Sequence, residues 1–147
     1  MSNKIAYTTG TFDLVHEGHF EFFKIIKEIY GFQKILVGLV TDEFAIKRKR
    51  KTILSYSHRK AILENSKYNI VVVPCTVSNK ITDYDKLKFD ALFIEDGYYL
   101  EDEYIDFTKE HIDIPVYYLP RPPYENRIST TNIIKDIKER LKDTDWI

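Results

Sequence analysis

Short apolar runs alternate along this chain with segments in which apolar and polar positions repeat at helical spacing. Five runs are short and continuously apolar, which is typical of strands buried on both faces of a sheet. They cover residues 4–9, 35–40, 70–74, 91–95 and 116–119. After the first run, apolar side chains at 22, 25, 26 and 29 follow the i, i+3, i+4, i+7 spacing of a helix, and Gly31 is placed to end it.

Three more helices are predicted from the same pattern. Ser55 can cap a helix that runs to about residue 68, residues 101–110 read as a short helix, and a last helix follows Ser129 with an apolar stripe at 133, 134, 137 and 141. Strands that alternate with helices favour right-handed crossovers and a parallel sheet covered on both faces. We therefore expect one α/β domain over residues 1–147, a Rossmann-like doubly wound parallel sheet of about five strands. With strand order 3-2-1-4-5, the ligand would bind beyond the end of the first strand.

Composition narrows the class of protein. With 147 residues, 44% of them hydrophobic and 31% charged, the chain fits one globular domain. It has no run long enough to span a membrane and no signal-peptide pattern, and its single cysteine, Cys75, excludes an internal disulfide, so we expect a cytoplasmic location. The five consecutive cations at 47–51 stand in a chain of net charge −1. Such a local cluster indicates an anion site and argues against broad nucleic-acid binding.

The segment 10–19, GTFDLVHEGH, follows the first strand and carries the strongest chemical signal. Gly10 permits a tight turn, and His16 and His19 fall at the start of the next helix, where backbone N–H groups are unpaired and the helix dipole is positive. We expect these N–H groups and imidazoles to bind a phosphate, with Gly18 leaving room for it. Two ordinary histidines are the plain alternative. Zinc is disfavoured because the only cysteine is distant and no third ligand is close.

GTFDLVHEGH resembles the HxGH signature of the nucleotidyltransferase superfamily, in the form typical of cytidylyltransferases such as the glycerol-3-phosphate cytidylyltransferase family. Later segments agree in order: TDEF at 41–44, SYSHR at 55–59, YLPR at 118–121 and ISTT at 128–131. The resemblance covers about residues 4–137. It implies transfer of CMP from CTP to a small phosphorylated alcohol such as glycerol 3-phosphate, with release of pyrophosphate. It also implies Mg²⁺ bound with the nucleotide phosphates rather than held by protein ligands, a homodimer, and a product used as a precursor for a cell-surface polymer or lipid.

The resemblance also assigns residues. Catalysis falls to His16, His19 and Arg50. The nucleotide site takes in Gly10, Thr11, Phe12, His16, Gly18, His19, Arg50, Arg59, Asp96, Arg121, Arg127, Ile128, Ser129, Thr130 and Thr131. The acceptor phosphate is assigned to Asp42, Arg48 and Lys80. Plainer interpretations stand beside these: a basic run is most often a solvated loop, Ser and Thr before a helix are ordinary caps, and an Arg at a helix start forms a surface ion pair.

The chain departs from the family pattern at a few positions. Lys67 stands where the family has Arg, Glu95 replaces a Gly, Tyr98 replaces a Trp, and Arg127 takes the place of a Gly. The segment 129–134 also resembles the tail of heptose-phosphate adenylyltransferases. An adenylyltransferase acting on a sugar phosphate is therefore the alternative function, and a nucleotide-binding sensor module without activity is a second alternative.

Overall fold

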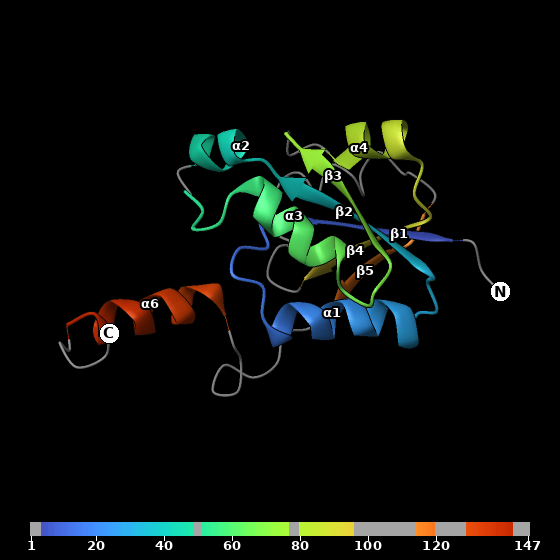
Figure 1. The fold of residues 1–147 in the computed structure, drawn as a ribbon. Helices are drawn as coiled ribbons and strands as arrows, with labels where there is room; N and C mark the ends of the chain where they lie inside the picture. The colour runs from blue at the N-terminus through green and yellow to red at the C-terminus, as the bar shows by residue number, and fades with distance from the viewer. Residues whose placement is uncertain (1–3, 49–50, 77–79, 96–113, 120–128, 143–147) are drawn as a thin grey trace.

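Five parallel strands form the centre of the protein. The structure is a computed structural model that describes residues 4–48, 51–76, 80–95, 114–119 and 129–142. The strands form one sheet of order β3-β2-β1-β4-β5, as Figure 1 shows. Their bounds are β1 (Ile5–Gly10), β2 (Lys34–Val40), β3 (Ile70–Cys75), β4 (Ala91–Glu95) and β5 (Val116–Leu119). The predicted strands are thus confirmed to within one residue at each end, and so is the predicted order.

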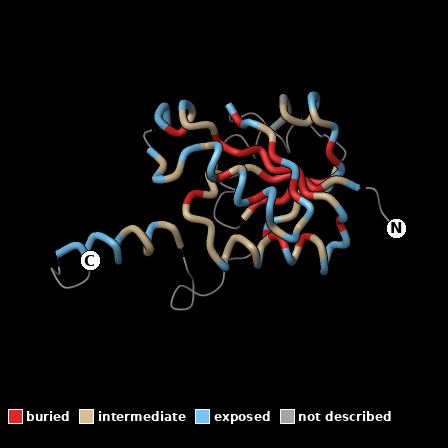
Figure 2. The backbone as a smooth tube through the Cα atoms, in the orientation of Figure 1, coloured by how far each residue is buried: buried red, intermediate tan, exposed pale blue. Residues whose placement is uncertain are grey.

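Helices cover both faces of the sheet. The described helices are α1 (Glu17–Glu28), α2 (Asp42–Lys47), α3 (Tyr56–Glu64), α4 (Lys80–Leu87) and α6 (Thr130–Arg140). Phe23 and Ile26 of α1 and Leu63 of α3 pack in one core cluster, while side chains of α4 pack on a second cluster around Tyr7. Figure 2 shows the buried residues concentrated along the strands. This confirms the doubly wound α/β class.

Two helices were not expected, and one ends early. The basic segment was predicted as a loop, but Lys47 is the last residue of α2, and the stretch before β4 contains α4. The helix capped by Ser55 ends at Glu64 rather than near residue 68. The helix predicted over 101–110 lies outside the described residues. None of the helices that the structure describes is long and apolar enough to cross a membrane.

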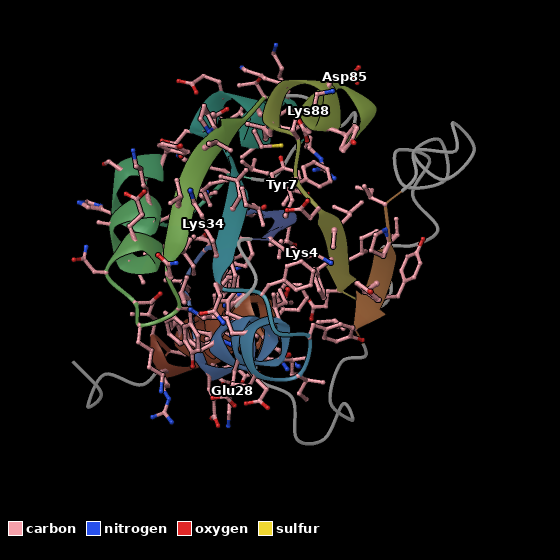
Figure 3. The ribbon with its side chains drawn as sticks, turned by 90° about the vertical axis from the view of Figure 1, so that its right-hand side faces the viewer. Lys4, Tyr7, Glu28, Lys34, Asp85 and Lys88 are labelled. Carbon is pink, nitrogen blue, oxygen red and sulfur yellow. The ribbon has the colours of Figure 1, made fainter. Side chains whose placement is uncertain are left out.

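Tyr7 links β1 to α4. Its ring is 1% exposed and stacks on Phe89 with centroids 4.5 Å apart, and its hydroxyl donates to Asp83 Oδ2 at 3.0 Å. Figure 3 shows Tyr7 in the interior beneath α4, whereas Asp85 points outward. Gly38 on the neighbouring strand makes this possible, because a Cβ there would collide with the Tyr7 hydroxyl. The central sheet therefore requires glycine at this position.

The helix α6 projects from the body of the domain beyond the amino end of α1 (Figure 1). No residue of α6 is buried, and Ile137 and Leu141 of its apolar stripe are exposed. Its first turn is nevertheless attached to the turn after β1, because the Thr130 hydroxyl donates to the carbonyl oxygen of Asp13 at 2.7 Å. The ends of β1 and β2, the start of α1 and the start of α6 thus meet at the carboxyl edge of the sheet.

Candidate active site

His16 and His19 cap the helix α1 reciprocally. His16 is the N-cap residue, and its Nδ1 accepts from the backbone N–H of Gly18 at 3.0 Å. The Nδ1 of His19 in turn accepts from the backbone N–H of His16 at 3.2 Å. The expectation that this helix start offers unpaired N–H groups is therefore wrong for Gly18, whose N–H is taken by an imidazole. The side chains of the two histidines are therefore the donors that the structure identifies for an anion here.

The hydrogen bonds fix the form of both imidazoles. A neutral imidazole that accepts at Nδ1 carries its proton at Nε2. His16 and His19 therefore each keep an Nε2–H donor that their own capping bonds do not use. Their ring centroids lie 4.0 Å apart, so the two donors come from side chains in contact. The arrangement presents paired neutral donors at the carboxyl end of β1.

Burial keeps these imidazoles neutral. It lowers the pKa of His16, and it lowers the pKa of His19 to about 4, with repulsion from His16 adding to the effect of desolvation. The positive end of the α1 dipole acts in the same direction. Near pH 7 the pair therefore donates hydrogen bonds without carrying a cation.

The turn before α1 is strained. Phe12 and Leu14 both adopt left-handed backbone conformations, with φ of 48° and 49°. This conformation is uncommon outside glycine and is found where the surroundings hold it, often at functional sites. Gly10 is needed beside it, because a Cβ there would lie 2.7 Å from the Phe12 ring. Gly10 itself is the last residue of β1, so the turn lies after it, and glycine is needed there because of the Phe12 ring rather than for its own backbone conformation.

Asp13 connects the turn to the segment after the basic cluster. Its carboxylate is buried and accepts from the backbone N–H of Ile53 at 2.7 Å and of Leu54 at 3.0 Å. Its carbonyl oxygen also receives the Thr130 hydroxyl. No role was predicted for Asp13, although it stands within the motif. A carboxylate in a turn after a buried strand was the available signal, but its partners come from distant residues.

Arg59 is a positioning residue in this structure. It was expected to bind nucleotide, but its side chain is fully buried, and four of its hydrogen bonds go to protein atoms. Two lead to the carbonyl oxygens of Thr11 at 2.7 Å and Val40 at 2.8 Å, and one to Asp42 Oδ1 at 2.8 Å. A guanidinium has five N–H groups, so little is left for a ligand. The anionic partner inferred for this helix-start arginine is Asp42.

Asp42 is also engaged by protein groups, although its side chain is partly exposed. Its Oδ2 accepts from the backbone N–H of Tyr56 at 3.1 Å, and its Oδ1 pairs with Arg59. The Tyr56 bond, followed by the Arg59 contact, holds the pKa of Asp42 below its usual range. The carboxylate therefore already has partners, which differs from the acceptor-phosphate contact expected for it. Arg48, the second acceptor candidate, is exposed at the end of α2 with its guanidinium 5.5 Å from the Phe44 ring centroid.

Some of the remaining predicted residues lie in the described part of the chain, and the others lie outside it. Thr11, Gly18, Ser129, Thr130 and Thr131 lie in the first turn, at the start of α1 and at the start of α6. Ser129 caps α6 by accepting from the backbone N–H of Asn132 at 3.1 Å, and Lys80 begins α4. Outside the described residues lie Arg50, Asp96, Arg121, Arg127 and Ile128.

Lys67 follows α3 and comes near the amino edge of the sheet. It comes two residues before Asn69, whose carbonyl oxygen accepts from Ile35 N–H at the start of β2. The histidines lie at the other edge, and the seven residues of β2 span roughly 20 Å at about 3.3 Å per residue. The Lys67 ammonium faces the Tyr68 ring at 5.5 Å.

The carboxylates near the histidines are already bonded to protein groups. Among the residues that the structure describes, no three His, Cys, Asp or Glu side chains gather as ligands. Both oxygens of Asp13 and both of Asp42 accept hydrogen bonds from protein groups. Mg²⁺ keeps several waters and often binds through substrate phosphates with few protein ligands.

The cytidylyltransferase-like family model matches residues 7–136, which include the turn, both histidines and the start of α6. The chain belongs to this family. Its cytidylyltransferase-like relatives include the glycerol-3-phosphate cytidylyltransferase of Bacillus spizizenii, 38% identical over 135 residues, with 91% of this chain and 97% of that protein covered. The enzyme of the same name from Bacillus subtilis is 34% identical over the same shares of the two chains.

Solved structures agree on the fold. A lipopolysaccharide core biosynthesis protein from Thermoplasma volcanium superposes with a TM-score of 0.65, covering 82% of this chain and 98% of that one. Its sequence identity is 17%, so it is similar in architecture alone. The cytidylyltransferase-like assignment rests on the family model and the sequence relatives, and this neighbour supports the overall fold.

Proposed function

We propose that this protein transfers CMP from CTP to glycerol 3-phosphate, or to a closely similar phosphorylated alcohol, and releases pyrophosphate. The observation that carries the proposal is the pair of neutral Nε2–H donors on His16 and His19 at the carboxyl end of β1. Relatives named glycerol-3-phosphate cytidylyltransferase, at 34–38% identity over 91% of the chain, support this substrate pair.

The reaction needs little proton transfer. An acceptor phosphate oxygen forms a bond to the α-phosphorus of CTP, while the bond from that phosphorus to the oxygen bridging it to the β-phosphorus breaks. The electron pair leaves with pyrophosphate. Because a phosphate monoester is largely ionised near pH 7, the attacking oxygen does not require a general base. The protein must supply orientation and donors for the charge that develops on the transferred group.

His16 and His19 suit the role of donors better than that of bases. Their Nδ1 atoms already accept backbone hydrogen bonds, and their Nε2 atoms carry the protons. A donor that is held in place before the reaction gains strength as negative charge builds up on the α-phosphate. We propose that both Nε2–H groups bind the α-phosphate in the transition state.

The other phosphates are assigned to the start of α6 and to the basic residues. The Thr130–Asp13 hydrogen bond brings this helix start to the turn after β1, which supports a role for residues 129–131 in holding the β- and γ-phosphates. Arg50, Arg121 and Arg127 supply the matching charge in this proposal. Mg²⁺ bound on the triphosphate would neutralise the leaving group.

The test is pyrophosphate release with CTP, glycerol 3-phosphate and Mg²⁺. His19→Asn is the sharpest variant, because an Asn oxygen can replace Nδ1 as the cap acceptor while the Nε2–H donor is lost. We expect turnover to fall by about 10²- to 10³-fold in a folded protein. His19→Asn with unchanged turnover would overturn the donor assignment. Turnover with ATP and a sugar phosphate alone would replace the proposal with the adenylyltransferase, and binding of CTP without release would favour the sensor module.

We also propose that the protein works as a cytoplasmic homodimer. The exposed apolar side chains of Ile137 and Leu141 on α6 support an association between copies, and a single cysteine, the buried Cys75, is compatible with a reducing compartment. Light scattering of the purified full chain at several concentrations tests the dimer, and a mass equal to one chain throughout would reject it.

A further inference from the structure

A line of rings connects the core of the domain with the two histidines. Phe23 of α1 is fully buried, and the ring of Phe12 lies 5.4 Å from it, measured between centroids. The Phe12 ring also lies 5.3 Å from the His19 ring, and the His19 ring lies 4.0 Å from that of His16, again between centroids. Phe12 is therefore an aromatic side chain that contacts both the rigid core and the candidate catalytic pair.

The backbone holds this ring in an unusual place. The φ of 48° at Phe12 is a left-handed conformation, and the ring lies over Gly10, where a Cβ would come within 2.7 Å of Cε2. A strained backbone of this kind persists where its surroundings fix it. Gly10 and Phe23 both approach the Phe12 ring closely, which leaves it little freedom to move.

The donor role of His19 depends on a fixed orientation of its imidazole. Its Nδ1 accepts from the backbone N–H of His16 at 3.2 Å, and this bond determines that the proton stays on Nε2. Rotation of the imidazole about its Cβ–Cγ bond, or transfer of the proton between nitrogens, would remove the donor. A flat, immobile ring packed against the imidazole opposes that rotation.

We propose that the Phe12 side chain is a positioning residue, which holds the His19 imidazole with Nδ1 on the His16 N–H and Nε2–H toward the transferred phosphate. The purpose of the Nε2–H donor rests on the proposed cytidylyl transfer. The orientation of the ring does not, because it is a property of the free protein. Phe12 was expected to border the nucleotide. The proposal gives its ring a second role, which is to orient the His19 imidazole.

The first test uses the free protein. Long-range proton–nitrogen NMR distinguishes protonated from unprotonated imidazole nitrogens, and we expect His19 of the wild type to show a single tautomer with Nε2 protonated. In Phe12→Leu we expect the two nitrogens to move toward averaged shifts. Phe22→Leu is the matched control, because this half-buried ring also lies against Phe23, at 5.8 Å, and should leave the His19 pattern unchanged. If Phe12→Leu does not fold, Gly10→Ala displaces the same ring without removing it and should give the same averaging.

The second test is kinetic. With CTP and glycerol 3-phosphate, we expect Phe12→Leu to lower kcat by about tenfold or more while KM for CTP stays within about twofold, since a misplaced donor acts on the transition state. Phe22→Leu should keep both constants. An unchanged His19 tautomer in Phe12→Leu would overturn the proposal, and so would a raised KM with normal kcat, which would place the ring against the nucleotide. If the wild type has no transferase activity, the proposed function fails while the NMR comparison still decides the role of the ring.

Discussion

The guanidinium of Arg59 lies 2.8 Å from the carboxylate of Asp42, and the arginine side chain is fully buried while that of Asp42 is 41% exposed. The same guanidinium donates to the carbonyl oxygens of Thr11, just after β1, and Val40, at the end of β2. One side chain of α3 thereby joins the ends of the two strands that border the site. Its cost of burial is offset by hydrogen bonds rather than by the ion pair alone.

We expect Arg59→Lys to lower the free energy of unfolding by about 3 kcal/mol, because a lysine cannot reach four acceptors and leaves buried carbonyl oxygens unpaired. Urea unfolding measures this. Lys67→Met, an exposed change beyond the other end of α3, serves as the control and should stay within about 0.5 kcal/mol of wild type. Equal stability of Arg59→Lys and wild type would show that the acceptors find other donors.

Thr130→Val tests the attachment of α6. The change removes the hydroxyl that donates to the Asp13 carbonyl oxygen, a bond worth about 1 kcal/mol. If the start of α6 holds the triphosphate, KM for CTP should rise about fivefold, with a smaller effect on KM for glycerol 3-phosphate. Thr130→Ser keeps the hydroxyl and should behave as wild type. A fall in kcat with unchanged KM would instead place Thr130 at the reacting phosphate.

The sequence predicted the sheet well because buried parallel strands are continuously apolar, as in β2, and each such run matches a strand. It did not predict α2 and α4, which are short. The apolar residues of α2 are few, and its start at Asp42 reads equally well as a loop. Local patterns give no information on contacts between distant residues. This limit is clearest at the site.

Arg59 illustrates the limit at the site. The sequence places an arginine at the start of a helix, where its charge calls for an anionic partner. It does not indicate whether this partner is a ligand or Asp42. The histidine pair was predicted as donors, while the use of Gly18 N–H by His16 depends on side-chain rotamers that spacing does not specify. Asp13 was missed because its partners, such as Leu54, lie some forty residues away. Each case depends on a tertiary contact.

Acid should weaken the folded state through His19. The His19 pKa is about 4 in the folded protein, against an ordinary value of 6.5 for a free imidazole, so the unfolded chain binds the proton first as pH falls. Folding stability is therefore full above about pH 6.5 and is lost as pH falls toward about 4, by about 1 to 2 kcal/mol near pH 5. Urea unfolding near pH 7 and near pH 5 measures the loss. His19→Asn removes the titrating group and keeps a cap acceptor, so its free energy of unfolding should fall less between pH 7 and pH 5. A fall equal to that of the wild type would assign the acid sensitivity to other groups.

Gly38→Ala tests the close approach of β1 and β2 at the centre of the sheet. The added Cβ would collide with the Tyr7 hydroxyl and lie 2.8 Å from Cγ2 of Thr9, in a fully packed interior. We expect the free energy of unfolding to fall by about 2 kcal/mol or more. Because the nearest obstacle is one hydroxyl group, Tyr7→Phe should relieve part of the clash while also losing the bond to Asp83. The double variant Gly38→Ala/Tyr7→Phe should therefore lose less free energy of unfolding than the sum of the losses of the two single variants. We expect the difference to be about 0.5 kcal/mol or more in a double-mutant cycle. Simple additivity would mean that the strand shifts as a whole to admit the methyl group, and that Tyr7 and Gly38 are not coupled through the hydroxyl.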